Sequence, residues 1–352
     1  MKKEKVTYGL IGFGGMGNWH TQILERVPQV EIAGIYDIRE DRRRQAQNLG
    51  FAVYEKEEDM LSDNAVDVVL IATPNDSHKP IALRAMHAGK HVISEKPVTL
   101  SSEDLKEMTD TAKQTGRFLT VHQNRRWDED FLTVQRIFKE QTLGRVFRIE
   151  SRVHGSRGIP GDWRGTKEHG GGMVLDWGVH LFDQILCLAG ERKVKTVYAS
   201  LTNVTNQIVD DGFTAILRFD DGLEVLAETC TSSFISLPRW YVLGENGTAV
   251  IRDWNLDGEM IQASGKDETD VMPVKTAAGL TKTMAPRRDD TIRRMELPKV
   301  SGDIADFHRN VAAVLLSGAQ PAVRMDQAAR VMRLMEAVFL SAQTNQAVLF
   351  ES

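Results

Sequence analysis

The chain has 352 residues, of which 41% are apolar and 26% are charged, and its formal net charge is −5. This length allows two domains, each with its own core, and the mild acidity gives no reason to expect a nucleic acid or a membrane surface as partner. No apolar run approaches the about 18 residues of a spanning segment, so we expect no transmembrane helix.

The start of the chain and the two cysteines both indicate a cytoplasmic protein. The charged and then apolar N-terminus superficially resembles a secretory leader, but Tyr8 and Gly9 interrupt it and no small-residue cleavage pattern follows. Cys187 and Cys230 each lie in an apolar segment, which favours buried thiols in a reducing compartment over a disulfide.

Strand-like and helix-like segments alternate through the first third of the chain. Such alternation predicts an α/β fold with a doubly wound parallel sheet, which we assign to residues 1–122. Strands are predicted at 6–11, 31–37, 67–73, 91–94 and 118–121, and helices at 18–27, 40–49, 56–62, 77–88 and 101–116.

A glycine-rich turn joins the first strand to the first helix. Its sequence is Gly12-Phe13-Gly14-Gly15-Met16-Gly17, which matches G-x-G-x-x-G in the strand-to-helix context that this pattern needs. Gly12 permits a tight turn, Gly14 lets the backbone approach a pyrophosphate, and Gly17 lets the helix pack closely on the sheet. The helix N-terminus then faces the phosphates, so the turn predicts a dinucleotide site.

The end of the second strand indicates which dinucleotide binds. Asp37 lies 20 residues after Gly17, where a carboxylate accepts hydrogen bonds from the ribose hydroxyls and repels a 2′-phosphate. We therefore predict NAD rather than NADP, with Ile38 and Arg39 beside the ribose. Arg39 weakens this preference, because an arginine there can hold a phosphate.

Two more segments follow strands at the edge where such sheets bind ligands. They are Thr73-Pro74-Asn75-Asp76-Ser77-His78 and Glu95-Lys96-Pro97. The proline fixes Lys96, which we expect to project into the cofactor crevice; a surface lysine before a turn is the simpler alternative. The residues expected beside the cofactor here are Thr73, Pro74, Asn75, His78, Glu95 and Lys96.

After residue 122 the strands follow one another without intervening helices. We predict a mostly antiparallel sheet with one covered face in a second domain, residues 123–352, whose last helices can pack back on the first domain. The flat sheet favours a homodimer or homotetramer. Strands are predicted at 145–155, 194–202, 213–219, 223–233, 239–244 and 248–253, a strand or two with a long loop within 262–300, and helices at 303–317 and 325–345.

The stretch GGGMVLDWGVHLFDQ, residues 170–184, places polar residues in an otherwise apolar run. Asp176 and His180 are four residues apart and share one helix face, with Asp183 a further turn along. A metal site is one interpretation, but two ligands are too few, and we expect no metal. A satisfied polar pair in the core is a second. A catalytic face is favoured, because Lys96 independently brings a third polar group to the crevice.

Together these segments resemble the glucose–fructose oxidoreductase / inositol dehydrogenase / rhizopine-catabolism (Gfo/Idh/MocA) family. The resemblance covers the first 190 residues in order and continues only as a pattern. It implies an N-terminal Rossmann domain, a C-terminal α/β domain with a large, open, mostly antiparallel sheet, and a cis bond between Lys96 and Pro97. The matching residues are GFGGMG at 12–17, Asp37, TPNDSH at 73–78, EKPVTL at 95–100 and GGGMVLDWGVHLFD at 170–183.

The resemblance further implies that Lys96, Asp176 and His180 form the catalytic set of a sugar or polyol dehydrogenase. His180 is then the general base for the substrate hydroxyl, Lys96 donates a hydrogen bond to the same oxygen, and Asp176 orients the substrate. The reaction is hydride transfer between a carbinol carbon and the nicotinamide, which Trp163 and Arg164 are expected to border.

Substrate contacts are expected from polar residues that open the second domain and from the loop after its first strand. Hydrogen-bond donors beside Trp127 and Trp163 suit a polyhydroxylated ring, although the arginines also suit a carboxylate or a phosphate, and each residue alone can be an ordinary surface side chain. The candidates, besides Lys96, Asp176 and His180, are Asn124, Arg125, Arg126, Arg152, His154, Arg157, Asp162 and Arg164, and Asn124 is also expected to contact the cofactor.

The leading hypothesis is an NAD-dependent dehydrogenase of a cyclic polyol, sugar or glycoside. An NAD-retaining glycoside hydrolase that acts by transient oxidation at C3 is an alternative, and it would release no NADH. An imine or aldehyde reductase would act only in the direction that consumes NADH. A dinucleotide-sensing regulator without catalysis is disfavoured, because both Lys96 and His180 are present.

Overall fold

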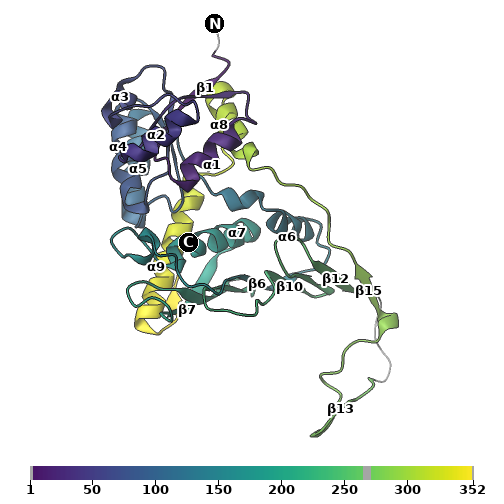
Figure 1. Cartoon of the computed structure of the whole chain (residues 1–352). Helices are drawn as coiled ribbons and strands as arrows, with labels where there is room; N and C mark the ends of the chain where they lie inside the picture. The colour runs from purple at the N-terminus through teal and green to yellow at the C-terminus, as the bar shows by residue number, and fades with distance from the viewer. Residues whose placement is uncertain (1–2, 265–270, 351–352) are drawn as a thin grey trace.

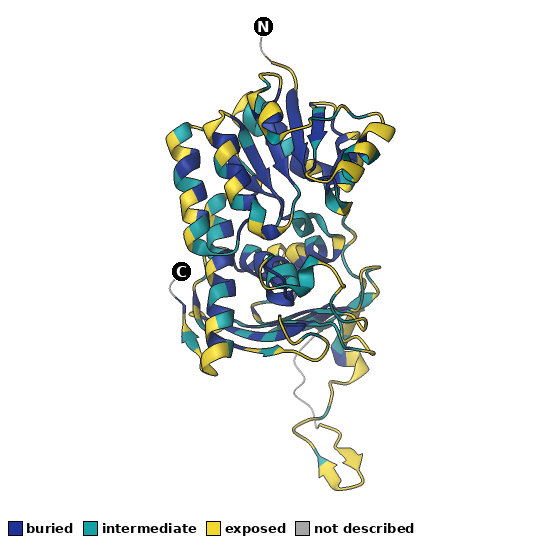
Figure 2. Cartoon of the chain, turned by 60° about the vertical axis from the view of Figure 1, so that its left-hand side comes forward, coloured by how far each residue is buried: buried dark blue, intermediate teal, exposed yellow. Residues whose placement is uncertain are grey.

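The computed structural model describes residues 3–264 and 271–350. Two layered units lie one above the other; the C-terminal helix α8 (Ala305–Ser317) lies beside the first unit, and α9 (Met325–Thr344) runs beside both (Figure 1). The strands of the first sheet are mostly buried, whereas those of the second sheet alternate between buried and half-buried residues, and most helices other than α7 are buried on one side and exposed on the other (Figure 2). In this part of the chain no helix has the length and apolar character needed to cross a membrane.

The first unit is a five-stranded sheet in the order β2-β1-β3-β4-β5, and every neighbouring pair is parallel. The direction of strand succession reverses between β1 and β3, and ligands of such sheets bind at this switch point. The elements are β1 (Val6–Ile11), α1 (Gly15–Leu24), β2 (Val30–Tyr36), α2 (Glu40–Asn48), α3 (Glu57–Ser62), β3 (Val68–Ile71), α4 (His78–His87), β4 (His91–Ser94), α5 (Ser102–Thr115) and β5 (Leu119–Val121).

Local sequence explains these boundaries. All four residues of β3 are buried, as its continuous apolar run requires of a central parallel strand. Helix α5 begins where the Ser101 hydroxyl accepts a hydrogen bond from the amide of Asp104, and it ends at Gly116 with φ of 65°. Helix α1 begins at Gly15, three residues earlier than predicted, because glycines are weak helix formers and disguise the first turn.

The second unit is a nine-stranded sheet in the order β15-β12-β11-β10-β6-β9-β8-β7-β16. Its pairs are antiparallel except β6 with β9, so the predicted mostly antiparallel sheet is confirmed. The strands are β6 (Val146–His154), β7 (Val194–Thr202), β8 (Gly212–Phe219), β9 (Glu224–Cys230), β10 (Trp240–Gly244), β11 (Gly247–Ile251), β12 (Gly258–Ala263), β15 (Ile292–Met295) and β16 (Val348–Leu349), and a separate hairpin pairs β13 (Val274–Thr276) with β14 (Gly279–Thr281).

One face of this sheet is covered by helices. One of these helices, α6 (Glu129–Lys139), was not predicted from the sequence, although it is amphipathic. The Trp240 indole of β10 donates to Asp130 of α6 at 2.7 Å. Arg239, which precedes β10, reaches Gln184 of α7 (Val179–Ala189) at 2.7 Å. The opposite face carries no helix among the elements described, and we call it the open face.

The C-terminal helix α9 connects the two units. Its Glu336 carboxylate accepts hydrogen bonds from the amide and the hydroxyl of Ser102, at 2.6 and 2.7 Å, and so contacts the N-terminus of α5. Helix α8 packs beside α1 and β1 and places His308 against Tyr8 and His20.

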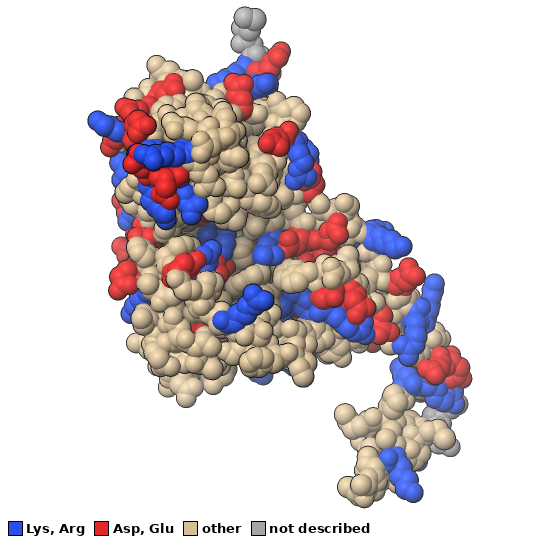
Figure 3. Space-filling model, viewed as in Figure 1, with Lys and Arg blue, Asp and Glu red and all other residues tan. Residues whose placement is uncertain are grey.

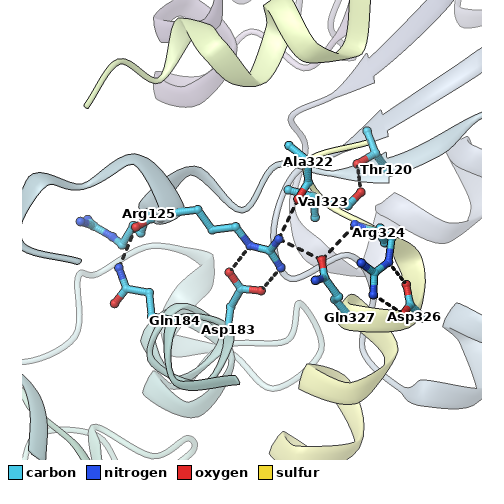
Figure 4. Close-up of polar contacts among 10 residues, drawn as sticks. Thr120, Arg125, Asp183, Gln184, Ala322, Val323, Arg324, Asp326 and Gln327 are labelled. Atoms are coloured by element: carbon cyan, nitrogen blue, oxygen red, sulfur yellow. Dashed lines mark hydrogen bonds and ion pairs between the residues drawn. The ribbon is translucent and has the colours of Figure 1, made fainter. Parts of the chain in front are cut away.

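A buried arginine connects the second unit to the start of α9. Arg126 donates two hydrogen bonds to Asp183 of α7, at 2.6 and 2.7 Å, and its guanidinium also reaches Gln327 and the carbonyl of Ala322. Figure 4 shows Asp183, Gln327 and Ala322 converging on this group. Asp183, expected on the face of Asp176 and His180, is therefore part of a structural ion pair, and Arg126 is not available as a substrate ligand.

We expect Arg126→Ala to lower the free energy of unfolding by about 3–5 kcal/mol, because it leaves Asp183 buried without its counter-charge. Chemical denaturation measures this loss. Arg136→Ala, which removes an exposed pair with Glu140 at 2.8 Å, is the matched control and should cost below about 1 kcal/mol. Equal losses in the two variants would contradict the role assigned to Arg126.

Candidate active site

The glycine-rich turn has two kinds of glycine. Gly12 has φ of +95°, and a Cβ there would lie 2.6 Å from the carbonyl oxygen of Ala72. A Cβ on Gly17 would lie 2.0 Å from the carbonyl oxygen of Gly12. At these two positions the neighbouring backbone leaves no room for a side chain. A Cβ on Gly14 or Gly15 would meet nothing within 4 Å, so the turn is open where a pyrophosphate has to approach the backbone.

Asp37 holds this turn in place. Its carboxylate accepts hydrogen bonds from the amide of Phe13 at 2.7 Å and from the amide of Arg39 at 2.9 Å. A carboxylate has about four lone-pair sites, so two remain for the hydroxyls of a ribose. The guanidinium of Arg39 forms an exposed ion pair with Asp41 at 2.6 Å.

A cleft of about 1000 Å³ opens above the turn, at the switch point between β1 and β3. It extends from the glycine turn to the loop of Trp163 and to Asp176 in the second unit. The residues predicted for cofactor, substrate or catalysis that line it are Gly12, Gly14, Gly15, Met16, Asp37, Ile38, Arg39, Thr73, Pro74, Asn75, Glu95, Lys96, Asp162, Trp163, Arg164 and Asp176.

Several residues predicted at the cofactor lie beneath the cleft and shape it. Phe13 and Gly17 are buried. The ring of His78 is buried between the carbonyl oxygens of Thr73 and Pro97, each at 2.9 Å, so this histidine joins the two loops. Asn75 donates its side-chain amide to the carbonyl of Gly170 at 2.9 Å, which connects the first unit to the second.

Lys96 crosses from one unit to the other. Its peptide bond to Pro97 is cis, as the resemblance implies. The ammonium donates to the Asp176 carboxylate at 2.8 Å and to the Asp176 carbonyl at 2.9 Å. Both side chains are about five-sixths buried, with exposures of 17% and 16%. The prediction that Lys96 projects into the crevice therefore agrees with its position.

Asp176 lies on a single turn of π-helix, Val174–Gly178, directly before α7. The sequence pattern had predicted a regular helix here. Asp210 sets the local geometry: its carboxylate accepts from the amide of Val174 at 2.8 Å and its carbonyl from the amide of Met173 at 3.0 Å. Gly172 has φ of +102°, and a Cβ there would lie 2.3 Å from the Asp210 carboxylate. Burial raises the pKa of Asp176, but Lys96 and Arg164 outweigh it and hold that pKa below its usual value.

His180 follows on the first turn of α7 and is 4% exposed. Burial lowers its pKa well below the usual value, and the positive charges of Lys96 and Arg125 lower it further. Its Nδ1 has no hydrogen-bond partner among the residues described. The imidazole is therefore neutral at physiological pH, with a ring nitrogen free to accept a proton.

Glu95 supports Lys96 from the side away from Asp176. Burial raises its pKa, but His122 and His20 outweigh this and hold the pKa well below its usual value, so the side chain is a carboxylate. It accepts from His20 Nε2 at 2.7 Å, from His122 Nδ1 at 2.8 Å and from the amide of Lys96 at 3.1 Å. Most of its hydrogen-bonding capacity is thus directed away from a cofactor.

The buried cluster of His20, His122 and His308 has the spacing of metal ligands, since one ring nitrogen of each lies within 4.8 Å of the others. Both nitrogens of His20 are already engaged, one by Glu95 and one by His308 at 3.2 Å. Only His122 Nε2 and His308 Nδ1 lack a partner in the described structure, fewer than the three protein ligands of a typical zinc site. We interpret the cluster as a hydrogen-bond network, and the absence of a metal stays a prediction.

Two residues predicted to contact substrate lie on the wrong side of the sheet. Ser151 of β6 bonds to Arg239 at 2.6 Å on the covered face. Neighbouring side chains of a strand point to opposite faces, so Arg152 and His154 lie on the open face. There Arg152 pairs with Glu150, and His154 pairs with Glu228 at 2.6 Å. This corrects their assignment as ligands of a substrate held at His180.

The other substrate candidates are distributed around the site. Arg125 pairs with Asp128 at 2.8 Å, and its guanidinium lies 4.2 Å from the ring of Trp177 and 5.0 Å from that of Trp254. Asn124 is half-buried and does not line the cleft, and Arg157 is exposed. Sequence reasoning missed Trp254, because it follows β11 and only the fold brings it to Arg125.

Two family descriptions match most of the chain. The NAD-binding Rossmann fold of an oxidoreductase family, GFO/IDH/MocA, matches residues 6–123, and the GFO/IDH/MocA C-terminal domain matches residues 131–250. The chain belongs to the GFO/IDH/MocA oxidoreductase family. The predicted fold class, with a parallel Rossmann sheet and a large mixed sheet, is confirmed.

Relatives of known sequence and structure agree with this membership. A scyllo-inositol 2-dehydrogenase (NADP(+)) of Bacillus subtilis, IolW, is 26% identical over 99% of this chain and 97% of its own length. A myo-inositol 2-dehydrogenase of Thermotoga maritima is 30% identical over 61% of this chain and 65% of its own. The crystal structure of an NAD-binding protein from Listeria innocua is 45% identical over 99% of this chain and all of that chain, with a TM-score of 0.95. The protein is thus an NAD(P)-binding oxidoreductase.

The π-turn gives a prediction about stability and pH. Burial raises the pKa of Asp210 to about 6 from 3.8, so its native carboxylate is destabilised above pH 6 and neutral near pH 4. Relative to wild type, Asp210→Asn should therefore gain up to about 3 kcal/mol of stability between pH 4 and pH 8. Denaturant unfolding at several pH values measures this.

Asp211→Asn is the matched control, and its expected change in stability has the opposite sign. Hydrogen bonds from Thr205 and Thr202 outweigh burial and lower the pKa of Asp211, so its charge stabilises the fold at neutral pH and this variant should lose stability from pH 4 to pH 8. A flat pH profile for Asp210→Asn would contradict the raised pKa.

Proposed function

We propose that the protein is an NAD-dependent dehydrogenase that oxidises a secondary hydroxyl of a cyclic polyol, sugar or glycoside. The observation that carries this is the contact between Lys96 and Asp176 at the cofactor cleft, one helical turn from a neutral, buried His180. The activities named for the two inositol dehydrogenase relatives support a cyclic polyol as substrate class.

Lys96 has the geometry of a hydrogen-bond donor to the reacting oxygen. An ammonium has three N–H donors, and two of them go to the carboxylate and the carbonyl of Asp176. The third remains for a substrate oxygen. In oxidation, Lys96 stabilises the negative charge that develops on that oxygen as its proton passes to the base, before the hydride leaves the carbon.

His180 is the acceptor of the hydroxyl proton. Its lowered pKa keeps the ring unprotonated at neutral pH, as a general base must be. Asp176 holds Lys96 and has its second carboxylate oxygen 3.6 Å from the guanidinium of Arg164, which leaves it able to accept from a neighbouring hydroxyl. When bound, NAD supplies the hydride acceptor at its nicotinamide. In reduction the roles of Lys96 and His180 reverse.

We also propose NAD as the preferred cofactor, although one relative is named as NADP-dependent. The Asp37 carboxylate is 9% exposed at the adenosine end of the cleft, where it repels a 2′-phosphate. Arg39, the residue that could attract that phosphate, is paired with Asp41.

The catalytic assignment predicts that Lys96→Met and His180→Asn each lower kcat by at least about 100-fold while the affinity for NADH is retained. His87→Asn, which changes an exposed histidine of α4, is the control and should leave kcat unchanged. The kcat/KM of the wild type for oxidation should decline on the acid side with a midpoint below pH 6.5, because the pKa of His180 is lowered. Unchanged turnover in either variant would refute the assignment.

These variants need a substrate, which a panel of inositols, free sugars and glycosides supplies, with NAD reduction followed by absorbance. Steady NADH release supports a dehydrogenase. Aglycone release without net NADH would instead support the NAD-retaining glycoside hydrolase.

The cofactor assignment predicts that Asp37→Asn lowers the NAD-to-NADP ratio of kcat/KM by at least about tenfold. Asparagine keeps an oxygen for the amide of Phe13, so the glycine turn retains its support while the charge is lost. Steady-state kinetics with both cofactors measures the ratio, with Glu103→Gln on α5, away from the cleft, as a control for loss of an exposed charge. A ratio unchanged in Asp37→Asn would overturn the role of Asp37.

A further inference from the structure

The adenosine end of the cofactor cleft continues beyond Asp37. It is formed by segments that follow β2 and β3, the two strands that flank β1. Ile38, after β2, is 84% exposed, more than any other large apolar side chain described in the first unit, and Pro80 of α4 is exposed as well. Both line the cleft. Because ligand pockets are lined mainly by apolar groups that the ligand covers, these two side chains indicate a ligand with an apolar face.

An ion pair lines the same end of the cleft. Glu57 begins α3, and both oxygens of its carboxylate accept hydrogen bonds from Arg84 of α4, at 2.7 and 3.0 Å. Two parallel hydrogen bonds fix the carboxylate in orientation as well as in position. Burial raises the pKa of Tyr36 and the charge of Glu57 raises it further, which agrees with a position of this carboxylate beside the end of β2.

The Glu57 carboxylate keeps acceptor capacity that the fold does not use. A carboxylate has about four lone-pair sites, and Arg84 occupies two of them. In residues 3–264 and 271–350 no other group donates to it, although its side chain is only 14% exposed. A fixed anion with free lone pairs inside a binding cleft selects a ligand that presents a hydrogen-bond donor.

The charge of the surrounding surface does not make this selection. Acidic and basic side chains lie side by side over α2 and α3 (Figure 3), so this end of the molecule has no single sign of charge. Purine bases are neutral, and they differ at the edge of the ring: adenine has a 6-amino donor where a 6-keto purine has an acceptor oxygen. Discrimination between them therefore needs an individual hydrogen-bonding group.

We propose that Glu57, fixed in place by Arg84, accepts a hydrogen bond from the 6-amino group of the adenine and so selects an adenine dinucleotide over one that carries a 6-keto purine. The flat faces of the base then cover Ile38 and Pro80. This inference rests on the proposed cofactor and extends it, because Asp37 contacts the ribose and Glu57 contacts the base. A keto oxygen at the same position would face a carboxylate oxygen, which leaves two acceptors opposed without a proton between them.

The probes are NADH and reduced nicotinamide hypoxanthine dinucleotide, which differ at this edge of the base. Fluorescence titration of the wild-type protein gives both dissociation constants without a substrate. NADH should bind at least about tenfold more tightly, because the exchange loses a charge-assisted hydrogen bond. Tight but equal binding of the two would overturn this inference and leave the cofactor assignment intact. Binding of neither would refute both.

Glu57→Gln tests the residue itself. Glutamine keeps an oxygen for Arg84 and can turn its amide NH₂ toward a keto oxygen, so the preference for NADH should fall by at least about tenfold. Glu58→Gln is the matched control: Glu58 is the next residue of α3, is exposed and does not line the cleft, and its variant should keep the wild-type ratio.

The ratio compares two ligands on the same variant, so a general loss of stability does not alter it. An unchanged ratio in Glu57→Gln would mean that the pair of Glu57 with Arg84 only joins α3 to α4, and it would overturn the proposal. Because the readout is binding of the dinucleotides, it is independent of the activity proposed for Lys96 and His180.

Discussion

The ion pair between Lys96 and Asp176 is the contact on which the rest of the site depends. Lys96 follows β4 in the first unit and Asp176 precedes α7 in the second, so the pair exists only when the two units are docked. Each partner has its own support: the Glu95 carboxylate accepts from the Lys96 amide, and Asp210 binds the amide of Val174 at the start of the π-turn. Helix α9, which packs against both units, supports this docking although it contributes no residue to the cleft.

The charges around this pair keep His180 neutral. Two cations, Lys96 and Arg125, disfavour a proton on His180, whereas Asp176 is kept ionised by Lys96 and Arg164. The role of general base that we propose for His180 requires this environment. Asp176 lies within the π-turn and His180 directly after it, and π-turns of this kind are frequent at functional sites.

Local patterns predicted the parts of the fold and of the site that depend on neighbours in sequence. The glycine turn, the position of Asp37 after β2 and the lysine before Pro97 all follow from short-range geometry, and the structure places them at one cleft. The errors arose where distant segments meet. Arg152 and His154 lie on the opposite face of the sheet from Ser151, and only the pairing of β6 with its neighbours decides which face each residue occupies. The cluster of His20, His122 and His308 and the stack of Arg125 with Trp254 join positions far apart in the chain, which no sequence pattern connects.

The nine-stranded sheet separates two tasks by the alternation of its side chains. On β6, Ser151 contacts α7 through Arg239, whereas the next residue, Arg152, faces outward. The covered face, on which α7 rests, is packed and apolar, whereas the open face carries rows of Arg–Glu pairs interrupted by single apolar residues, which keep an uncovered sheet face compatible with water.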